Sequence, residues 1–561
     1  MACTKIFSGN LPEVMSKIIQ YFQNDYSTLH SCILVNRLWC RLAIPLLWED
    51  PFSLKYPKNY RYIEVYLNNL NENERTQLNK YGINNGLFLL NPLFNYTIFI
   101  HHLDTCIIKK SIEKWVATVE TSIIEEQLDY LRQKNNDLNY TKLIYKLLLQ
   151  IFVENKENHI YTFKTAVVLD EDFEYFDDAI EIILQNPSFI CNIRNLILDF
   201  EISNENTTKF MKFISSKCNY ISLLHFSFPL FCNTVIEKHL SQIIDSQQNL
   251  KKILFSFNNS VPLHHSLLSL KNSNCANTLR TIIFYYVNFK NIVILNEVFE
   301  KLNVLESIHI YYCSFLLNSG FIEQIINLTR PFYLKSLFVD ELIDSLELLQ
   351  LLLQKSGNYL ENFGLGSLKR EVLDLIIRYC TKIKFLEFRG RFKNQAIYKI
   401  FQLIEKVKLS LNYLIIDIYE IDNDVEFDSI LLQNLGQILP SKLEYLNLEL
   451  TINISDFEIF LKNSQNTFIK KLLIKNIRNR GQQQEGQEIE TFLPYIKEYI
   501  MKKKRTEYLA FQDYIYNQAS INNNDLVSLK DEVKEFRLYN IIVQNYFDLN
   551  INVPAFINEM Y

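Results

Sequence analysis

A short motif of apolar residues, spaced apolar-x-x-apolar-x-apolar, recurs through most of this chain of 561 residues. Its eleven clear copies begin at Ile193, Ile221, Leu250, Leu279, Leu305, Leu334, Leu360, Ile383, Leu411, Leu443 and Ile469. The ten intervals cover 276 residues, a mean of 27.6, and weaker copies begin at Phe163, Thr506 and Val533. A fixed period of about 20 to 50 residues is typical of stacked repeats, because each unit buries its apolar face only against its neighbours. Most of the chain is therefore predicted to form an elongated array.

Helices are expected between the short strands of this array. Ile397, Ile400, Phe401 and Ile404 follow helical spacing, and the same pattern recurs between other copies. Alternation of short strands with helices predicts an α/β fold with a parallel sheet, whose strands line the concave side of a curved solenoid.

Side chains between the buried positions of each strand point to the opposite face, because a strand alternates its side chains. Aromatic residues are frequent among these outward positions, and charges are few. A surface of this kind suits a protein or peptide partner. The residues predicted to bind such a partner are Tyr285, His309, Tyr311, Phe385, Glu387, Arg389, Tyr413 and Tyr445. For any one aromatic residue, the alternative is that it packs on its ladder neighbours and contacts no partner.

The segment from Leu11 to Trp48 has a different pattern, which fits three short helices. Asn10 can cap the first helix, Pro12 lies where a missing amide proton costs little, and Glu13 can reach back as in a capping box. A bundle this small cannot hide all of its apolar side chains. Part of that surface is therefore expected to bind a partner.

This segment resembles an F-box. The matching residues are Leu11, Pro12, Glu13, Ile18, Asp25, Leu29, Val35, Asn36, Arg37, Trp39, Arg41, Leu42, Ala43 and Trp48. The resemblance implies docking onto a Skp-family adaptor, which in turn carries a cullin and a RING subunit. The residues it implies for adaptor binding are Leu11, Pro12, Glu13, Met15, Ile18, Leu29, Val35, Trp39 and Trp48. The alternative is a helical N-terminal cap of a larger domain.

The repeat, in turn, resembles the leucine-rich class found with F-boxes, and the whole arrangement is similar to fungal families that combine the two. We expect F-box helices over residues 8–50, a stiff helical connector over 51–159, and a leucine-rich-repeat-like solenoid over 160–550. The apolar stretch from Leu526 to Phe547 is expected to close the end of the solenoid.

Composition argues against several classes of partner and location. A net charge of -5 gives no electrostatic footprint for nucleic acid. No apolar run approaches the ~18 residues of a membrane span, and the N-terminus does not read as a signal peptide. Ten cysteines without a Cys-x-x-Cys pair fit reduced thiols. A cytoplasmic or nuclear protein is expected.

Motifs for catalysis are missing from the sequence. There is no phosphate-binding Gly-x4-Gly-Lys-Ser/Thr loop, no dinucleotide fingerprint and no His-Glu-x-x-His. The pair His101-His102, with Asp104 and Cys106, and the pair His264-His265 lack the spacing of a metal site. We therefore predict a non-enzymatic protein with no cofactor and no metal.

The function expected from this resemblance is that of a substrate-recognition subunit in a Skp-cullin-F-box type ubiquitin ligase. Its F-box would dock on the adaptor, and its concave face would hold a protein substrate for ubiquitination. The alternative is a leucine-rich scaffold that acts through protein interactions outside a ligase.

Overall fold

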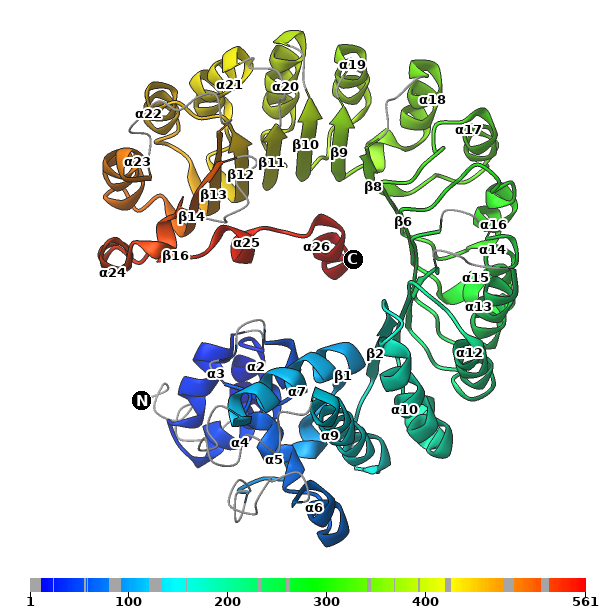
Figure 1. Cartoon of the computed structure of the whole chain (residues 1–561). Coiled ribbons are helices and arrows are strands. Elements are labelled where there is room, and N and C mark those ends of the chain that lie inside the picture. Colours follow the sequence, from blue (N-terminus) through cyan, green and yellow to red (C-terminus); the bar gives the residue numbers. More distant parts are fainter. Residues whose placement is uncertain are drawn as a thin grey trace. The chain divides into compact units, whose positions relative to one another are not determined.

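The computed structural model describes residues 12–23, 25–54, 57, 59–79, 92–120, 134–157, 159–229, 234–258, 263–340, 345–367, 369–391, 394–418, 425–478, 489–515 and 524–561. The chain divides into two compact units, Met1–Leu279 and Arg280–Tyr561. Figure 1 labels the elements of both. The division falls within the repeats, so the predicted domain limits at 50, 159 and 550 stay predictions.

The first unit begins with the predicted three-helix cluster, formed by α2 (Pro12–Gln20), α3 (Tyr26–Ile33) and α4 (Arg37–Leu47). Side chains cap two of these helices: Asp25 accepts a hydrogen bond from Thr28 N, and Asn36 from Trp39 N, each at 3.0 Å. Each bond satisfies an amide that has no partner inside the helix. The cluster is closed by a core of Ile19, Leu29, Cys32 and Ala43.

The next segment is mostly helical, as predicted, but it also begins the sheet. Its elements are η1 (Pro51–Ser53), α5 (Tyr62–Leu67), α6 (Glu72–Asn79), η3 (Tyr96–Phe99), β1 (His102–Asp104), α7 (Thr105–Glu120) and α9 (Lys134–Glu154). Strand β1 pairs in parallel with β2, the first strand of the repeats. The region predicted as a connector therefore shares backbone hydrogen bonds with the array.

Strands and helices then alternate to the end of the first unit. They are β2 (Thr162–Val167), α10 (Asp172–Gln185), α11 (Pro187–Cys191), β3 (Asn195–Phe200), α12 (Glu205–Lys217), β4 (Leu223–Ser227), α13 (Thr234–Ser246), β5 (Lys252–Ser256), α14 (His264–Ser269) and α15 (Ser273–Thr278). Each strand from β1 to β5 is parallel to the next in chain order.

The second unit continues the alternation. Its repeats are β6 (Thr281–Tyr285), α16 (Leu295–Lys301), β7 (Ser307–Tyr311), α17 (Ser319–Ile326), β8 (Leu334–Val339), α18 (Leu346–Ser356), η5 (Gly357–Tyr359), β9 (Asn362–Ser367), α19 (Arg370–Tyr379), β10 (Phe385–Arg391), α20 (Asn394–Val407), β11 (Tyr413–Ile418), α21 (Val425–Ile438), β12 (Lys442–Leu450), α22 (Ile454–Asn463), β13 (Phe468–Arg478), α23 (Ile489–Ile496), the π-helical turn η6 (Lys497–Met501) and β14 (Thr506–Ile515). Strands β6 to β14 are parallel and pair in chain order.

The last part of the second unit departs from the repeat. It contains β15 (Asn524–Asp525), which is antiparallel to β14, then η7 (Leu526–Ser528), α24 (Lys530–Leu538) and β16 (Ile542–Val543), which is parallel to β14. Two short helices follow, α25 (Tyr546–Leu549) and α26 (Val553–Met560).

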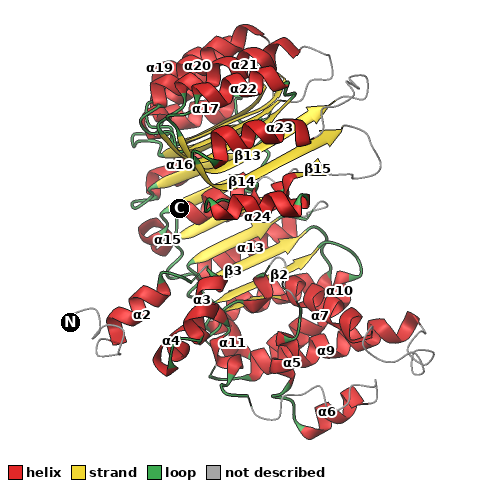
Figure 2. Ribbon diagram, turned by 90° about the vertical axis from the view of Figure 1, so that its left-hand side faces the viewer, coloured by secondary structure: helices red, strands yellow, loops and turns green. Residues whose placement is uncertain are grey.

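The mixed α/β class and the alternation of parallel strands with helices are confirmed (Figures 1 and 2). All eleven clear copies of the motif contain a strand, and so do the weaker copies at Phe163 and Thr506. The weak copy at Val533 was a wrong prediction, because that residue lies in helix α24.

Candidate functional site

The three-helix cluster exposes apolar side chains that its own core cannot take in. Val14, Ile18 and Tyr21 follow one another at intervals of four and three residues, so they share one side of α2 and the turn after it. Leu34 and Val35, between α3 and α4, are 75% and 58% exposed. Exposed apolar groups on so small a bundle make it a candidate surface for a protein partner.

The residues predicted to bind an adaptor divide into three groups. Glu13, Ile18 and Val35 are exposed and available to a partner. Met15 and Leu29 are fully buried, which corrects their assignment as contact residues: Leu29 belongs to the core of the cluster itself. Leu11 and the side chain of Pro12 lie outside the described residues.

The two tryptophans of the segment serve the packing of the first unit. Trp39 is half-buried and packs against the core of the cluster. The Trp48 ring lies 4.2 Å from that of Tyr96 and 5.5 Å from that of Tyr66, centroid to centroid. Trp48 therefore fastens the cluster to the segment that follows.

The buried carboxylate of Glu49 joins the cluster to the start of the sheet. Its Oε1 lies 3.3 Å from His101 Nδ1 and 3.5 Å from His102 Nε2. The carboxylate also accepts hydrogen bonds from Tyr161 Oη at 2.9 Å and from Gln23 Nε2 at 2.6 Å. The hydrogen bonds from His101 and His102 hold the pKa of Glu49 well below its usual range, against the effect of burial. Glu49, two residues after α4, thus connects the turn after α2 with β1 and with the residue directly before β2.

An aromatic cluster makes a second connection between the same parts. Phe52 of η1 stacks on Tyr66 of α5 at 6.0 Å, and both rings meet Phe152 of α9 edge to face. Glu64 of α5 accepts a hydrogen bond from Trp115 Nε1 of α7. These contacts pack Phe52, α5, α7 and α9 against one another through buried aromatic pairs and a buried hydrogen bond.

The second candidate surface is the face of the sheet in the second unit that lies opposite the helices α16 to α22 of its repeats, here called the inner face (Figure 1). Strand register arranges its side chains in three rows. The first row is His309, Ser336, Asn362, Phe385, Tyr413 and Tyr445; the second is Tyr311, Phe338, Gly364, Glu387, Ile415 and Asn447; the third includes Arg389, Asp417, Glu449, Lys475 and Gln512. The sheet therefore brings together seven of the eight predicted substrate-binding residues, and Tyr285 joins them because β6 pairs with β7.

The first row is not open, however, because residues 546–561 lie across it. We call these residues the crossing segment. The Tyr561 ring lies 4.6 Å from that of His309, and the Phe556 ring lies 4.9 Å from Tyr413 and 6.1 Å from Phe385. Tyr445 Oη donates to Asn550 Oδ1 and accepts from Ile551 N, both at 3.2 Å.

This cover corrects the prediction of a free concave surface. Four of the predicted residues, His309, Tyr311, Phe385 and Tyr445, are fully buried, and Glu387 is nearly so. Tyr285, Arg389 and Tyr413 are half-buried. Alternation along the strands was predicted correctly, but the sequence pattern of a strand does not show what lies above it.

Charged side chains run along the third row and border the crossing segment. Arg389 Nη2 lies 2.8 Å from Glu387 Oε1, and Arg389 Nε lies 3.4 Å from Asp417 Oδ2. Lys475 Nζ lies 2.9 Å from Glu449 Oε2. Burial, and then the charge of Glu449, raises the pKa of Asp417 to about 7 although Arg389 opposes the shift.

Gly364 has no side chain, and the space this leaves on the inner face admits the carboxylate of Glu387. A Cβ on Gly364 would lie 2.3 Å from Phe338 Cδ1 and 3.1 Å from Glu387 Oε2. In the space that remains, Tyr312 Oη donates to Glu387 Oε2 at 2.8 Å. Burial raises the pKa of Glu387, which Arg389 and this hydrogen bond partly offset.

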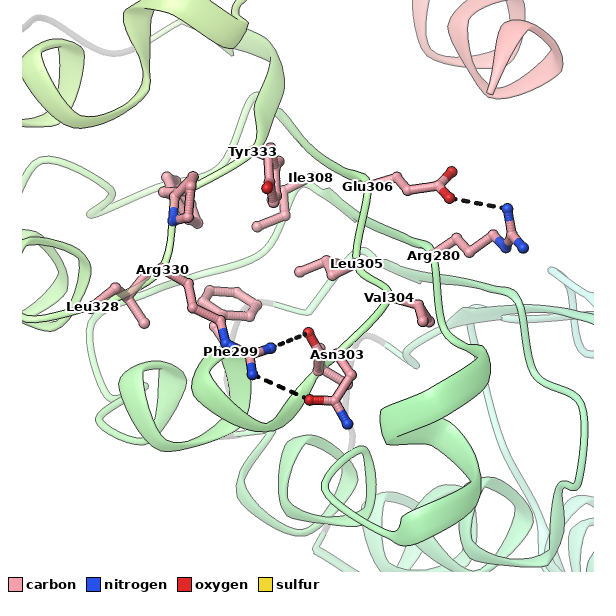
Figure 3. A pocket seen from close by; sticks show the side chains of 13 residues that line it. Arg280, Phe299, Asn303, Val304, Leu305, Glu306, Ile308, Leu328, Arg330 and Tyr333 are labelled. Carbon is pink, nitrogen blue, oxygen red and sulfur yellow. Dashed lines mark hydrogen bonds and ion pairs between the residues drawn. The ribbon is translucent and has the colours of Figure 1, made fainter.

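A cavity of about 430 Å³ lies elsewhere in the second unit, beside the segments that precede β7 and β8 (Figure 3). Its two guanidinium groups are engaged: Arg330 donates to Leu302 O and Asn303 Oδ1, both at 3.2 Å, and Arg280 pairs with Glu306 at 2.9 Å. The other lining residues are mostly apolar. No set of groups for acid, base or nucleophilic chemistry converges in it, so the cavity carries no assignment.

The histidine pairs considered in the sequence have other contacts. His101 and His102 lie against Glu49, and the rings of His264 and His265 meet edge to face at 5.6 Å. Among the residues that the structure describes, no group of three His, Cys, Asp or Glu could hold a metal ion. The described part of the chain also contains no helix long and apolar enough to cross a membrane.

Two features of the sequence could have revealed the crossing segment and the Glu49 contacts, neither of which was predicted. Tyr546, Ile551, Phe556 and Tyr561 recur at intervals of five residues, which fits neither a helix nor a strand. Glu49 is the first carboxylate after the apolar stretch that ends at the closing Trp48 of the cluster.

In comparisons with known proteins, no family model and no curated protein matches this sequence.

Proposed function

We propose that this chain is the substrate-recognition subunit of a ubiquitin ligase of the Skp-cullin-F-box type. The observation that carries the proposal is the exposed apolar surface of the three-helix cluster, formed by Val14, Ile18, Tyr21, Leu34 and Val35. Ile18 and Val35 also belong to the residues by which the segment resembles an F-box. Docking on a Skp-family adaptor would bury these side chains in an interface of about 1,200 to 2,000 Å².

The chain contributes position in this account, and the chemistry belongs to other subunits. A ligase accelerates ubiquitin transfer by raising the effective concentration of an acceptor lysine near the charged enzyme. That effect is lost when the connection between the docking helices and the substrate-binding repeats bends freely. The Glu49 contacts and the Trp48, Phe52 and Tyr66 packing support the proposal, because they fasten the docking helices to the first strands of the array.

Co-purification tests this function in the intact chain. The chain, expressed with a Skp-family adaptor, a cullin and a RING subunit, is expected to elute with all three in size-exclusion chromatography. An elution separate from the adaptor would contradict the proposal.

The alternative function is a repeat scaffold that acts outside a ligase. The observation that favours it is the cover over the inner face, because a scaffold needs no open substrate site there. It predicts binding of the adaptor without the cullin, or a complete complex that transfers ubiquitin to no captured protein.

A further inference from the structure

The crossing segment is held to the inner face almost entirely by side chains. Strand β16 is the last strand in the part of the chain that the structure describes, and it ends at Val543, before the crossing segment begins. Beyond it, the contacts with the inner face include aromatic rings, tyrosine hydroxyl groups, the side-chain oxygen of Asn550 and one backbone amide, Ile551 N, on Tyr445. The parallel ladder beneath is complete without the segment.

Four points of contact recur every five residues. Tyr546 Oη lies 2.8 Å from Asn447 Oδ1 and 2.6 Å from Glu449 Oε1. Ile551 meets Tyr445, and Phe556 packs between Phe385 and Tyr413.

The fourth contact is made by Tyr561, which meets Glu361, directly before β9, and His309 of β7. Tyr561 Oη donates to Glu361 Oε2 at 2.8 Å, and its ring covers His309. Burial alone would raise the pKa of Glu361, but hydrogen bonds from Lys335, Lys384 and Tyr561 lower it to about 2. The carboxylate is therefore a charged acceptor, the stronger kind of partner for a tyrosine hydroxyl.

We infer that the inner face is a peptide-binding site for segments of a partner protein that carry aromatic side chains ten and fifteen residues after a tyrosine, and that the crossing segment is its intramolecular occupant. The inference rests on the proposed function only in taking that partner to be the substrate. Three features support it: the inner face contacts its occupant through aromatic rings and hydroxyl groups at regular spacing, this occupant adds no strand to the sheet, and the strands beneath pair with one another without it.

The crossing segment belongs to the same chain, so it competes with a partner peptide for the inner face at a high effective concentration. Short flexible tethers give effective concentrations in the millimolar range, so a peptide of equal intrinsic affinity is outcompeted at micromolar concentration. Capture would thus require release of the crossing segment, or a partner peptide with better contacts.

The test uses a fluorescent peptide with the sequence of residues 544–561 and the full chain. Wild type is compared with the double variant Phe556→Ala, Tyr561→Ala, which removes two contacts of the occupant. The matched control is Phe547→Ala, Met560→Ala, because both of these side chains are exposed. Fluorescence anisotropy is expected to show binding to the double variant at least about tenfold tighter than to wild type or control. A peptide with alanine at positions 546, 556 and 561 is expected not to bind.

A folded double variant that binds no peptide would overturn the inference and make the segment a permanent part of the fold. If the variant fails to fold, hydrogen exchange on wild type decides: excess peptide is expected to speed exchange of amides in α26, and unchanged exchange would overturn the inference. Neither measurement contains an adaptor, so failure here is distinct from failure of the proposed docking function.

Discussion

Replacement of Gly364 by alanine is predicted to destabilise the second unit, because the inner face has no room for one more carbon there. The new Cβ would lie 2.3 Å from Phe338 Cδ1 and 2.8 Å from Cε1, whereas nonbonded carbons rest at about 3.5 to 4.0 Å. The Phe338 ring would have to move by about 1 Å or more. It cannot move freely, since the rings of Tyr311, Phe385 and Tyr312 lie 5.2 to 6.0 Å from it, centroid to centroid.

Overpacking of this kind costs roughly 1–3 kcal/mol. For a unit of this size, each kcal/mol lowers the midpoint of thermal unfolding by roughly 2–4 °C, so a fall of several degrees is expected. Scanning calorimetry of the full chain measures it. The matched control is Gly320→Ala in α17, where the nearest neighbour of the new Cβ is Asn318 Oδ1 at 3.3 Å. Unfolding of Gly364→Ala at the temperature of wild type and control would refute the account of a crowded inner face.

Three further variants test the polar contacts and the backbone. Glu49→Gln is expected to lose roughly 1–3 kcal/mol at pH 7 in chemical denaturation. Because the folded-state pKa of Glu49 lies below the ordinary 4.5, wild type should lose this advantage as the pH falls below about 4.5, and an advantage that persists in acid would contradict the assignment. Asp417 has a folded-state pKa raised from 3.8 to about 7, so it should lower the free energy of unfolding of wild type as the pH rises through this range. Asp417→Asn should remove that part of the pH dependence. Parallel plots of unfolding free energy against pH for the two proteins would disprove the shift. Gly390→Ala should lower the free energy of unfolding by roughly 1 kcal/mol or more, because Gly390 has a φ of +112° and its new Cβ would lie 2.1 Å from Gly366 O. An unchanged unfolding curve would contradict this.

The repeats could be predicted because their apolar spacing reports burial directly. Leu386 and Phe388 lie inside the array, while Glu387 and Arg389 point to the inner face, as alternation requires. The three-helix cluster was predictable for the same reason. Proline usually interrupts a helix, yet α4 continues through Pro45 to Leu47.

Contacts between segments far apart in the chain could not be predicted from these patterns. Glu49 meets Tyr161, a separation of 112 residues, and Tyr561 meets Glu361 across 200 residues. Neither pair belongs to the apolar spacing of the repeats, which shows what each strand buries but not which distant segment lies against it. The candidate site therefore differs from the prediction mainly in its cover, which places His309 and Tyr445 under the crossing segment.

The claim that the three-helix cluster docks on a Skp-family adaptor is tested most directly by calorimetry with the purified adaptor. Intact chain is expected to bind, and Val35→Asp should weaken binding at least about tenfold, or 1.4 kcal/mol, because it places a charge in an apolar interface. Val293→Asp, at an apolar residue 70% exposed in the second unit, is the matched control and should bind like wild type. No binding by the intact chain, or equal binding by Val35→Asp, would contradict the docking function.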